Sequence, residues 1–230
     1  MPFSGLNGPL PSQLMFDFGA ILKHIPFLLK GAEVTLLLSL SALVIGMCIG
    51  LVVALLRLSP SRVLRFAAGL YVDVLRSTPL LAQLMWLFFA LPILTGIALS
   101  PFAAGVLGLA LYAGAYLSEV YRSGILAIPQ GQLHASMALG MTTSQLLRRI
   151  ILPQAIFRVL PPLASLCMSL LKDSSLVSAI SLQELMYRGQ ALGNLTLHQL
   201  EALTVTATIY FVATYPFALL GNALHRRYQV

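Results

Sequence analysis

The chain has 230 residues, of which 58% are hydrophobic and only 9% are charged. Soluble domains carry roughly 25% charged residues, so this composition excludes an ordinary soluble fold and predicts an integral membrane protein. The net charge of +7 is explained by basic residues that set the membrane topology and contact anionic lipid. It gives no reason to expect nucleic-acid binding. Because the sequence contains no nucleotide-binding motif, we do not expect this chain to hydrolyse ATP.

The N-terminal 31 residues are interrupted by proline and glycine and are only moderately apolar. They lack a basic region followed by a cleavage site, so they do not read as a signal peptide. Apolar residues between Phe16 and Phe27 could form a helix that rests on the membrane surface. We therefore expect an extracytoplasmic or interfacial segment over residues 1–31 and one transmembrane domain over residues 32–227.

The first two membrane spans differ in continuity. The first is predicted at about residues 33–58, because its interior carries no charge and exceeds the ~20 residues that a bilayer crossing needs. The second region begins near Val63 and continues to Leu94. As one helix it would be ~48 Å long, which is too long for a ~30 Å hydrocarbon core. We expect a break at Pro79, because proline removes a backbone donor.

Three further spans are predicted at about residues 102–125, 146–171 and 200–224. Glu119 and Arg122 lie three apart in the first of these, so they can pair along one helical face. Isolated intramembrane charges would be functional candidates, but we favour a pair that braces the following loop. Residues 177–197 could form a short lid helix that faces the outside.

The basic residues set the orientation, because basic short loops remain in the cytoplasm. With five spans, most arginines fall on one side of the membrane: Arg57, Arg62, Arg65, Arg148, Arg149, Arg226 and Arg227. Lys23, Lys30 and Arg188 fall on the other side. We therefore place the N-terminus outside and the C-terminus in the cytoplasm.

The stretch from Gln130 to Pro153 is rich in small, hydroxyl and amide residues, unlike the oily sequence around it. It follows the helix breaker Pro129. Four apolar residues could give a helix one apolar side: Leu133, Met137, Leu139 and Met141. We predict a short amphipathic helix at about residues 130–142, lying at the cytoplasmic membrane surface.

This stretch resembles the EAA motif of the membrane subunits of bacterial ABC importers. The resemblance is carried by His134-Ala135-Ser136, Gly140 and Ile150-x-Leu152-Pro153. Other segments are similar to the polar amino-acid branch of that family: Arg76-Ser77-Thr78-Pro79-Leu80-Leu81, Glu119-x-Tyr121-Arg122 and Lys172-Asp173-Ser174-Ser175-Leu176. The family's glutamate is His134 here and its second alanine is Ser136, so we hypothesise a heterodimer whose other permease keeps the glutamate.

The resemblance implies the type I importer permease fold, all-α with about five transmembrane helices, in the cytoplasmic (inner) membrane. In that family the motif forms a coupling helix that docks on an ATPase subunit. Implied partners are a second permease subunit, identical or related, two ATP-binding cassette subunits and an extracytoplasmic amino-acid-binding protein. The coupling residues would be Gly131, Gln132, His134, Ala135, Ser136, Gly140 and Met141. ATP and Mg would bind the partner ATPase, and we expect no cofactor on this chain.

The end of the fourth span is the best candidate for substrate contact. The span contains Pro153, Pro161 and Pro162, and prolines at membrane depth free carbonyls that neighbours must satisfy. We expect Pro153 to be structural and the three prolines to bend the span. Lys172, Asp173, Ser174 and Ser175 follow, and an acid with two hydroxyls suits a zwitterion. A solvated helix end capped by Asp173 is the alternative.

Arg76 and Thr78 complete the predicted pathway, although Arg76 could instead snorkel to the membrane interface. The expected substrate is a polar amino acid, with cystine-like, basic and amide amino acids all possible. We predict no metal site, because the four histidines show no ligand spacing. The alternative function is an oligomeric channel or an ion-coupled secondary transporter, which would usually carry more carboxylates within its spans than Glu119 and Asp173.

Overall fold

The computed structural model describes residues 17–227, which are helical along most of their length and contain no strand. The elements in chain order are α1 Phe18–Leu22, α2 Ile25–Leu58, α3 Arg62–Ser77, α4 Leu80–Met85, the π-helical η2 Trp86–Ala90, α5 Leu91–Thr95, α6 Pro101–Leu126, α7 Gln130–Ala138, α8 Thr143–Leu146, the π-helical η3 Leu147–Ile151, α9 Leu152–Asp173, the 3-10 helix η4 Ser174–Ile180, α10 Leu185–Thr196 and α11 Gln199–Arg227.

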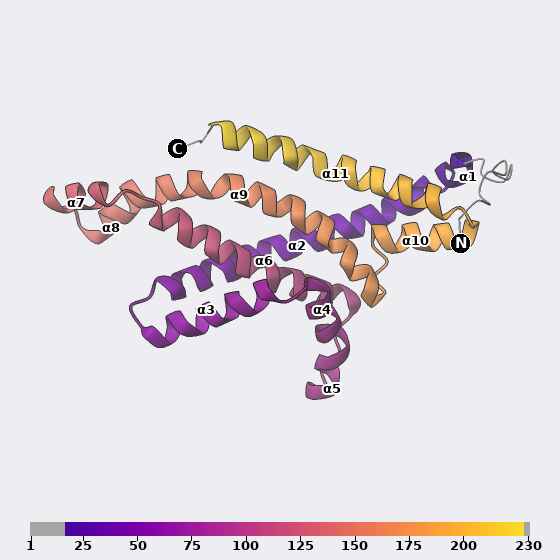
Figure 1. Ribbon diagram of the computed structural model, residues 1–230, viewed down its shortest axis with the longest axis horizontal. Coiled ribbons are helices and arrows are strands. Elements are labelled where there is room, and N and C mark those ends of the chain that lie inside the picture. Colours follow the sequence, from indigo (N-terminus) through magenta and orange to yellow (C-terminus); the bar gives the residue numbers. More distant parts are fainter. Residues whose placement is uncertain (1–16, 228–230) are drawn as a thin grey trace, which may run out of the picture.

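Four long helical stretches run along the length of the molecule (Figure 1). Each is long and apolar enough to cross a membrane: Ile25–Leu58, Pro101–Leu126, Thr143–Ile180 and Gln199–Leu224. A fifth crossing is possible if α3 counts as one span with the helix Leu80–Thr95, which is bent from it by 106°. The bend falls at Pro79, as the sequence predicts, and both Thr78 and Pro79 have extended backbone there.

The predicted boundary between residues 31 and 32 lies inside a continuous helix. Helix α2 begins at Ile25, with Pro26 in its first turn, and continues through Lys30 and Glu33. These two charges limit the apolar stretch without ending the helix, because proline at the start presets helical geometry and exposed charges are compatible with it. The helix therefore starts earlier than hydropathy indicates.

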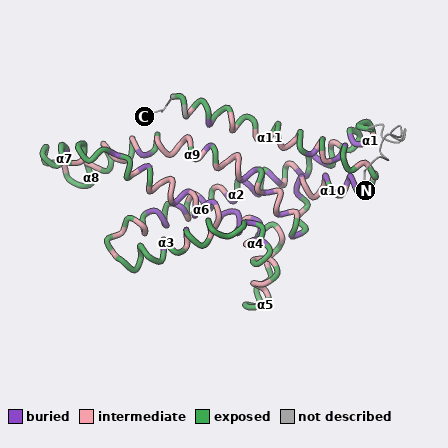
Figure 2. The backbone as a smooth tube through the Cα atoms, in the orientation of Figure 1, coloured by how far each residue is buried: buried purple, intermediate pink, exposed green. Residues whose placement is uncertain are grey.

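The core is built on close contact between α2 and α6. Glycines on α2 face α6 closely: a Cβ on Gly46 would lie 2.8 Å from Ala113 Cβ, and one on Gly50 would lie 2.7 Å from Leu117 Cβ. Such small residues let helix backbones approach closely. Buried residues concentrate along this contact and around α1 and α10, and they thin out toward the α7 end (Figure 2). The glycine pair of α2 thus packs within the chain.

The fourth span contains its prolines without a break in the helix. Helix α9 runs from Leu152 to Asp173 through Pro161 and Pro162, while Pro153 occupies its first turn. The irregular backbone lies just before it, in the π-helical turn η3. Bulges of this kind accommodate a local mismatch of hydrogen bonds.

The two ends of the bundle carry different short helices. Helices α7 and α8 lie at one end, with the α2–α3 connection and the last turns of α11 toward the same side, whereas α1 and α10 lie at the opposite end (Figure 1). The predicted lid helix exists as α10, but it packs against α2 and α11 through Leu185 and Leu192. The arginine-rich connections and the α7 end therefore share one side of the molecule, as the predicted topology requires.

Candidate functional site

A groove of about 540 Å3 lies between α6 and the C-terminal half of α9. Its lining residues are Tyr112, Tyr116, Val120, Pro162, Ser165, Leu166, Ser169 and Asp173. Ser165, Ser169 and Asp173 are spaced four apart on α9, so they share one helical face. Asp173 is half-buried at the end of that face. The groove therefore combines one carboxylate with several hydroxyl groups in a mainly apolar span.

A tyrosine pair on α6 forms the opposite wall. The ring centroids of Tyr112 and Tyr116 are 4.7 Å apart. The guanidinium carbon of Arg76, at the end of α3, lies 4.9 Å from the centroid of the Tyr116 ring, a cation–π distance. Tyr112 and Asp173 line the same groove from α6 and α9. Three separate helices thus bring a cation, an anion and two phenols to one place.

The structure does not bring the neighbouring polar residues to this groove, contrary to the sequence prediction. Ser174 is fully buried, and its hydroxyl donates to the Leu171 carbonyl at 2.8 Å. Lys172 and Ser175 line a separate cavity of about 560 Å3 beside α11. Successive residues of a helix point in different directions, so Asp173 cannot share a face with the residues next to it.

Thr78 also lies outside the groove lining. Its hydroxyl donates to the Val74 carbonyl at 2.8 Å and accepts a hydrogen bond from Gln83 Nε2 at 2.8 Å. The same amide nitrogen donates to the carbonyls of Thr78 and Leu75. The bond to Leu75 satisfies a carbonyl whose helical partner would be Pro79, which has no N–H. Thr78 therefore stabilises the corner between α3 and α4.

The predicted coupling helix is shorter than the sequence indicates. Helix α7 ends at Ala138, because Gly140 adopts φ +69° and the amides of Gly140 and Met141 bond back to the carbonyls of Met137 and Ser136. A left-handed glycine with such bonds terminates helices. Leu139 and Met141 thus lie beyond the helix, and the expected helix over residues 130–142 is wrong at its C-terminal end.

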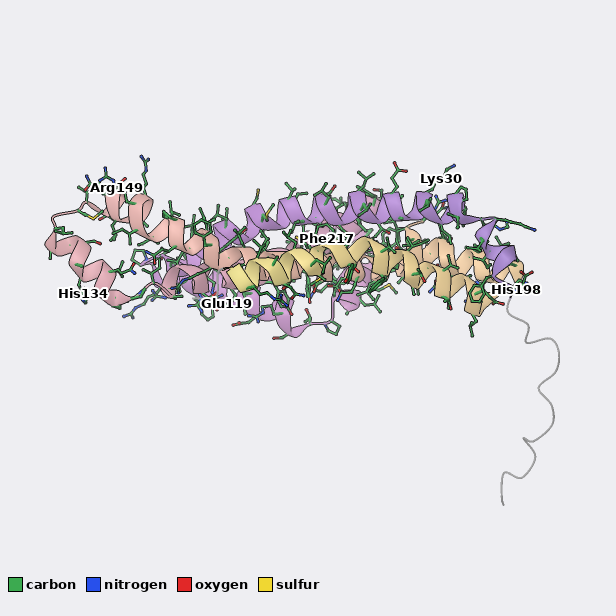
Figure 3. All side chains as sticks on the ribbon, turned by 90° about the horizontal axis from the view of Figure 1, so that it is seen from above. Lys30, Glu119, His134, Arg149, His198 and Phe217 are labelled. Carbon is green, nitrogen blue, oxygen red and sulfur yellow. The ribbon has the colours of Figure 1, made fainter. Side chains whose placement is uncertain are left out.

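The surface of α7 is largely free of contact with the rest of the chain. Ser136 is its buried residue and donates to the Gln132 carbonyl at 2.6 Å. Gly131, His134 and Ala135 are exposed, as are the apolar Met137 at 57% and Leu139 at 80%. Figure 3 shows His134 at the end of the molecule opposite to Lys30 and His198.

Comparison with known proteins identifies the family. The family of binding-protein-dependent transport system inner membrane components matches residues 46–230 of this chain. The chain belongs to this family. It is therefore an inner membrane component of an ABC transporter, a multi-pass protein of the cytoplasmic membrane, and the bundle, the α7 end and the groove between α6 and α9 are parts of a permease.

Individual relatives of this permease are transport proteins for amino acids. It is 36% identical over 211 residues to the arginine transport system permease protein ArtQ of Bacillus subtilis, covering 92% of this chain and 96% of that one. It is 39% identical over 204 residues to the L-cystine transport system permease protein TcyB of the same organism, covering 88% and 86%. The glutamine transport system permease protein GlnP of Escherichia coli is 33% identical over 218 residues, covering 94% and 100%.

Solved structures agree with the fold. A crystal structure of an amino acid ABC transporter with histidines matches with a TM-score of 0.87 and 36% identity, covering 92% of this permease and 98% of that chain. An inward-facing structure of the MetNI methionine ABC transporter matches with a TM-score of 0.68 at 21% identity, covering 88% and 98%. The second likeness concerns the fold alone.

Three charged residues near the α7 end of the permease form one cluster. Glu119 pairs with Arg122 along α6, and it also accepts a hydrogen bond from Arg57 at the end of α2. The sequence did not predict Arg57 as a member of this cluster, because it indicated Arg57 only as one of the basic residues that set the membrane orientation. The cluster ties the ends of α2 and α6 together just before the α6–α7 connection.

Tyr112 and Tyr116 were also missed as site residues. The sequence feature that could have revealed them is their separation by four residues in α6, which places both rings on one helical face. In an apolar span this pattern is typical of packing, so only the tertiary structure, which sets Arg76 and Asp173 beside them, distinguishes a groove wall from a core.

Proposed function

We propose that this permease is the transmembrane subunit of an ATP-driven importer that carries a polar amino acid across the cytoplasmic membrane. The observation that carries the proposal is the family match together with relatives named for arginine, cystine and glutamine. The neighbouring crystal structure of an amino acid transporter, at 36% identity over most of the chain, supports it.

The groove between α6 and α9 is the proposed substrate contact. Asp173 suits an α-ammonium group, because a charge-assisted hydrogen bond to a carboxylate is strong in a partly dry site. The Ser165 and Ser169 hydroxyls lie on the same face and replace Ser174 and Ser175 as candidates to orient the substrate. Arg76 suits the α-carboxylate once it leaves the Tyr116 ring, since guanidinium groups match carboxylate geometry.

The partners follow from the same proposal. One subunit cannot enclose a pathway, so a second permease, identical or related, pairs with it. Two ATP-binding cassette subunits bind ATP with Mg and dock on α7, and an extracytoplasmic binding protein delivers the amino acid. ATP binding brings the two coupling helices together, the spans rock to open outward, and hydrolysis resets them. His134 at the family's glutamate position favours a second permease that differs from this one.

Reconstituted transport tests the proposal. The complex that co-purifies with the tagged chain is placed in proteoliposomes with its binding protein, and uptake is scanned by competition between labelled amino acids. We expect uptake of polar amino acids that requires ATP and survives an ionophore. Uptake that follows an ion gradient and ignores ATP would instead indicate the secondary transporter. If the purified complex contains two copies of this permease and no other permease chain, the hypothesis of a heterodimer is contradicted.

The role of the groove is tested by Asp173→Asn. A charge-assisted hydrogen bond contributes roughly 1.5–3 kcal/mol, so uptake at limiting substrate should fall about tenfold or more. Assembly and basal ATP hydrolysis should survive, because α7 is unchanged. Glu33→Gln is the matched control, since Glu33 is exposed on α2. Parental uptake by Asp173→Asn would place the pathway elsewhere.

A further inference from the structure

Two side chains on the first turns of α9 hold the junction between α6 and α7. Gln154 Nε2 donates to Gln132 Oε1 on α7 at 2.7 Å. Arg158 Nη1 donates to the carbonyl of Ala127, the C-cap residue of α6, at 2.6 Å. Gln154 and Arg158 are four residues apart, so they lie on one face of α9. That face therefore contacts both sides of the short α6–α7 connection.

Close packing fixes the adjoining face of α9 against α6. A Cβ on Gly124 would lie 3.0 Å from Val159 Cγ2 and 3.5 Å from the Ala155 carbonyl oxygen. Ala155, next to Gln154, is buried. The first turns of α9 are thus packed against the end of α6 at the point where the chain turns into α7.

The covalent route from α7 to α9 is longer and irregular, although the amides of Gly140 and Met141 and the capping box at Thr142 make hydrogen bonds within it. It passes through Gly140, which has a left-handed backbone and no atom within 4 Å of a Cβ position, and then through the π-helical turn η3. Glycine is the residue with the greatest backbone freedom. The Gln132–Gln154 hydrogen bond bypasses this route and joins the first turn of α7 directly to the first turn of α9.

The far end of α9 carries Asp173 in the groove. We infer that Gln154 and Arg158 are positioning residues that make α7 and α9 move together, so that a displacement of α7 reaches the groove through α9. The inference rests on the proposed function, because α7 must be displaced by a docked ATPase. It assigns to these two side chains the transmission of movement rather than contact with substrate or nucleotide.

The test is the number of ATP molecules hydrolysed per amino acid imported, measured in proteoliposomes with the complete complex. In Gln154→Ala the ATPase should still co-purify and basal hydrolysis should be unchanged. The ratio of ATP hydrolysed to amino acid imported should rise about three- to tenfold. This is the change in an equilibrium constant that follows from the loss of one hydrogen bond. Arg158→Ala should act in the same direction. Gln190→Ala, exposed on α10 at the opposite end, is the matched control and should keep the parent ratio.

A paired substitution separates transmission from general damage. Gln132→Glu with Gln154→Lys replaces the amide pair by an ion pair, so the double variant should recover the ratio lost in Gln154→Lys alone. A parental ratio in both Gln154→Ala and Arg158→Ala, or no recovery in the paired variant, would overturn the inference. Loss of the ATPase from the variant complexes would overturn it too, because the residues would then serve assembly. A parent complex without ATP-dependent uptake would instead refute the proposed function.

Discussion

Helices α7 and α10 are both short and lie at opposite ends of the bundle, but they are held in different ways. Helix α10 buries Leu185, Leu192 and two glycines, and Thr206 on α11 leaves no room for a Cβ on Gly189. Helix α7 buries Ser136 and otherwise exposes its side chains. The proposed docking of an ATPase would cover the exposed surface of α7, whereas α10 already buries one face against α2 and α11, although Leu195 on it stays exposed.

A buried carboxylate accounts for much of the difference. Glu184 caps α10 and is fully buried. It accepts hydrogen bonds from the hydroxyls of Tyr210 at 2.6 Å and Thr35 at 3.2 Å, and from the Tyr187 amide at 2.8 Å. Three helices, α2, α10 and α11, therefore meet at one carboxyl group. The hydrogen bond from Gln154 to Gln132 that joins α9 to α7 is instead exposed to water.

The largest effect is expected at Gly140. Gly140→Pro demands φ near −65° where the backbone has +69°, and it removes the amide that bonds to Met137. The end of α7 should be displaced, so ATP hydrolysis stimulated by the loaded binding protein should fall at least tenfold while thermal stability changes little. Gly140→Ala, with a left-handed strain of only about 1–2 kcal/mol, is the control. Normal stimulation in a fully assembled Gly140→Pro complex would show that this end of α7 has no coupling role.

At the other end the expected loss is in stability. Glu184→Ala leaves two buried hydroxyls and an amide without their acceptor, which should lower the free energy of unfolding by about 3 kcal/mol. Thermal unfolding of the detergent-purified chain measures it, with exposed Glu33→Ala as the control. An unchanged melting temperature would mean that α10 is held by apolar packing alone.

A smaller effect concerns pH. Burial raises the pKa of the Glu184 carboxyl above its usual range, although hydrogen bonds from Tyr210, the α10 amides and Thr35 oppose the shift. A carboxyl whose folded pKa is raised stabilises the fold most below its unfolded pKa of about 4.3 and loses that contribution as pH rises through the folded value. The melting temperature of the parent should therefore decline over this interval, and Glu184→Gln should flatten the decline. Equal slopes would assign the pH dependence to other groups.

The sequence predicted local features well and long-range ones poorly. Hydropathy located the spans, Pro79 located the bend, and the spacing of Glu119 and Arg122 anticipated a pair that the structure contains. These features depend on neighbours within a few residues. The contact between Glu184 and Tyr210 joins separate helices, and periodicity within one helix carries no information about it.

The errors at the candidate sites have physical causes of the same kind. Asp173 and Ser174 are adjacent in sequence, but the helix turns them toward different surroundings, the groove and the core. Leu139 and Met141 match an amphipathic pattern, but the left-handed Gly140 ends the helix before they can join it. Motif spacing selected the candidate segments, and the backbone direction at each residue decided which of their side chains lie together.

Hydrogen–deuterium exchange of this permease, with and without the proposed ATPase subunit, tests the central claim most directly. If α7 is the docking helix, the amides of residues 130–138 should exchange more slowly when the ATPase is bound, because their exposed surface is covered. The amides of α10 should exchange at the same rate in both states, since they are already held by buried contacts. Unchanged exchange in α7 while the ATPase is bound, or new protection confined to α10, would contradict the account.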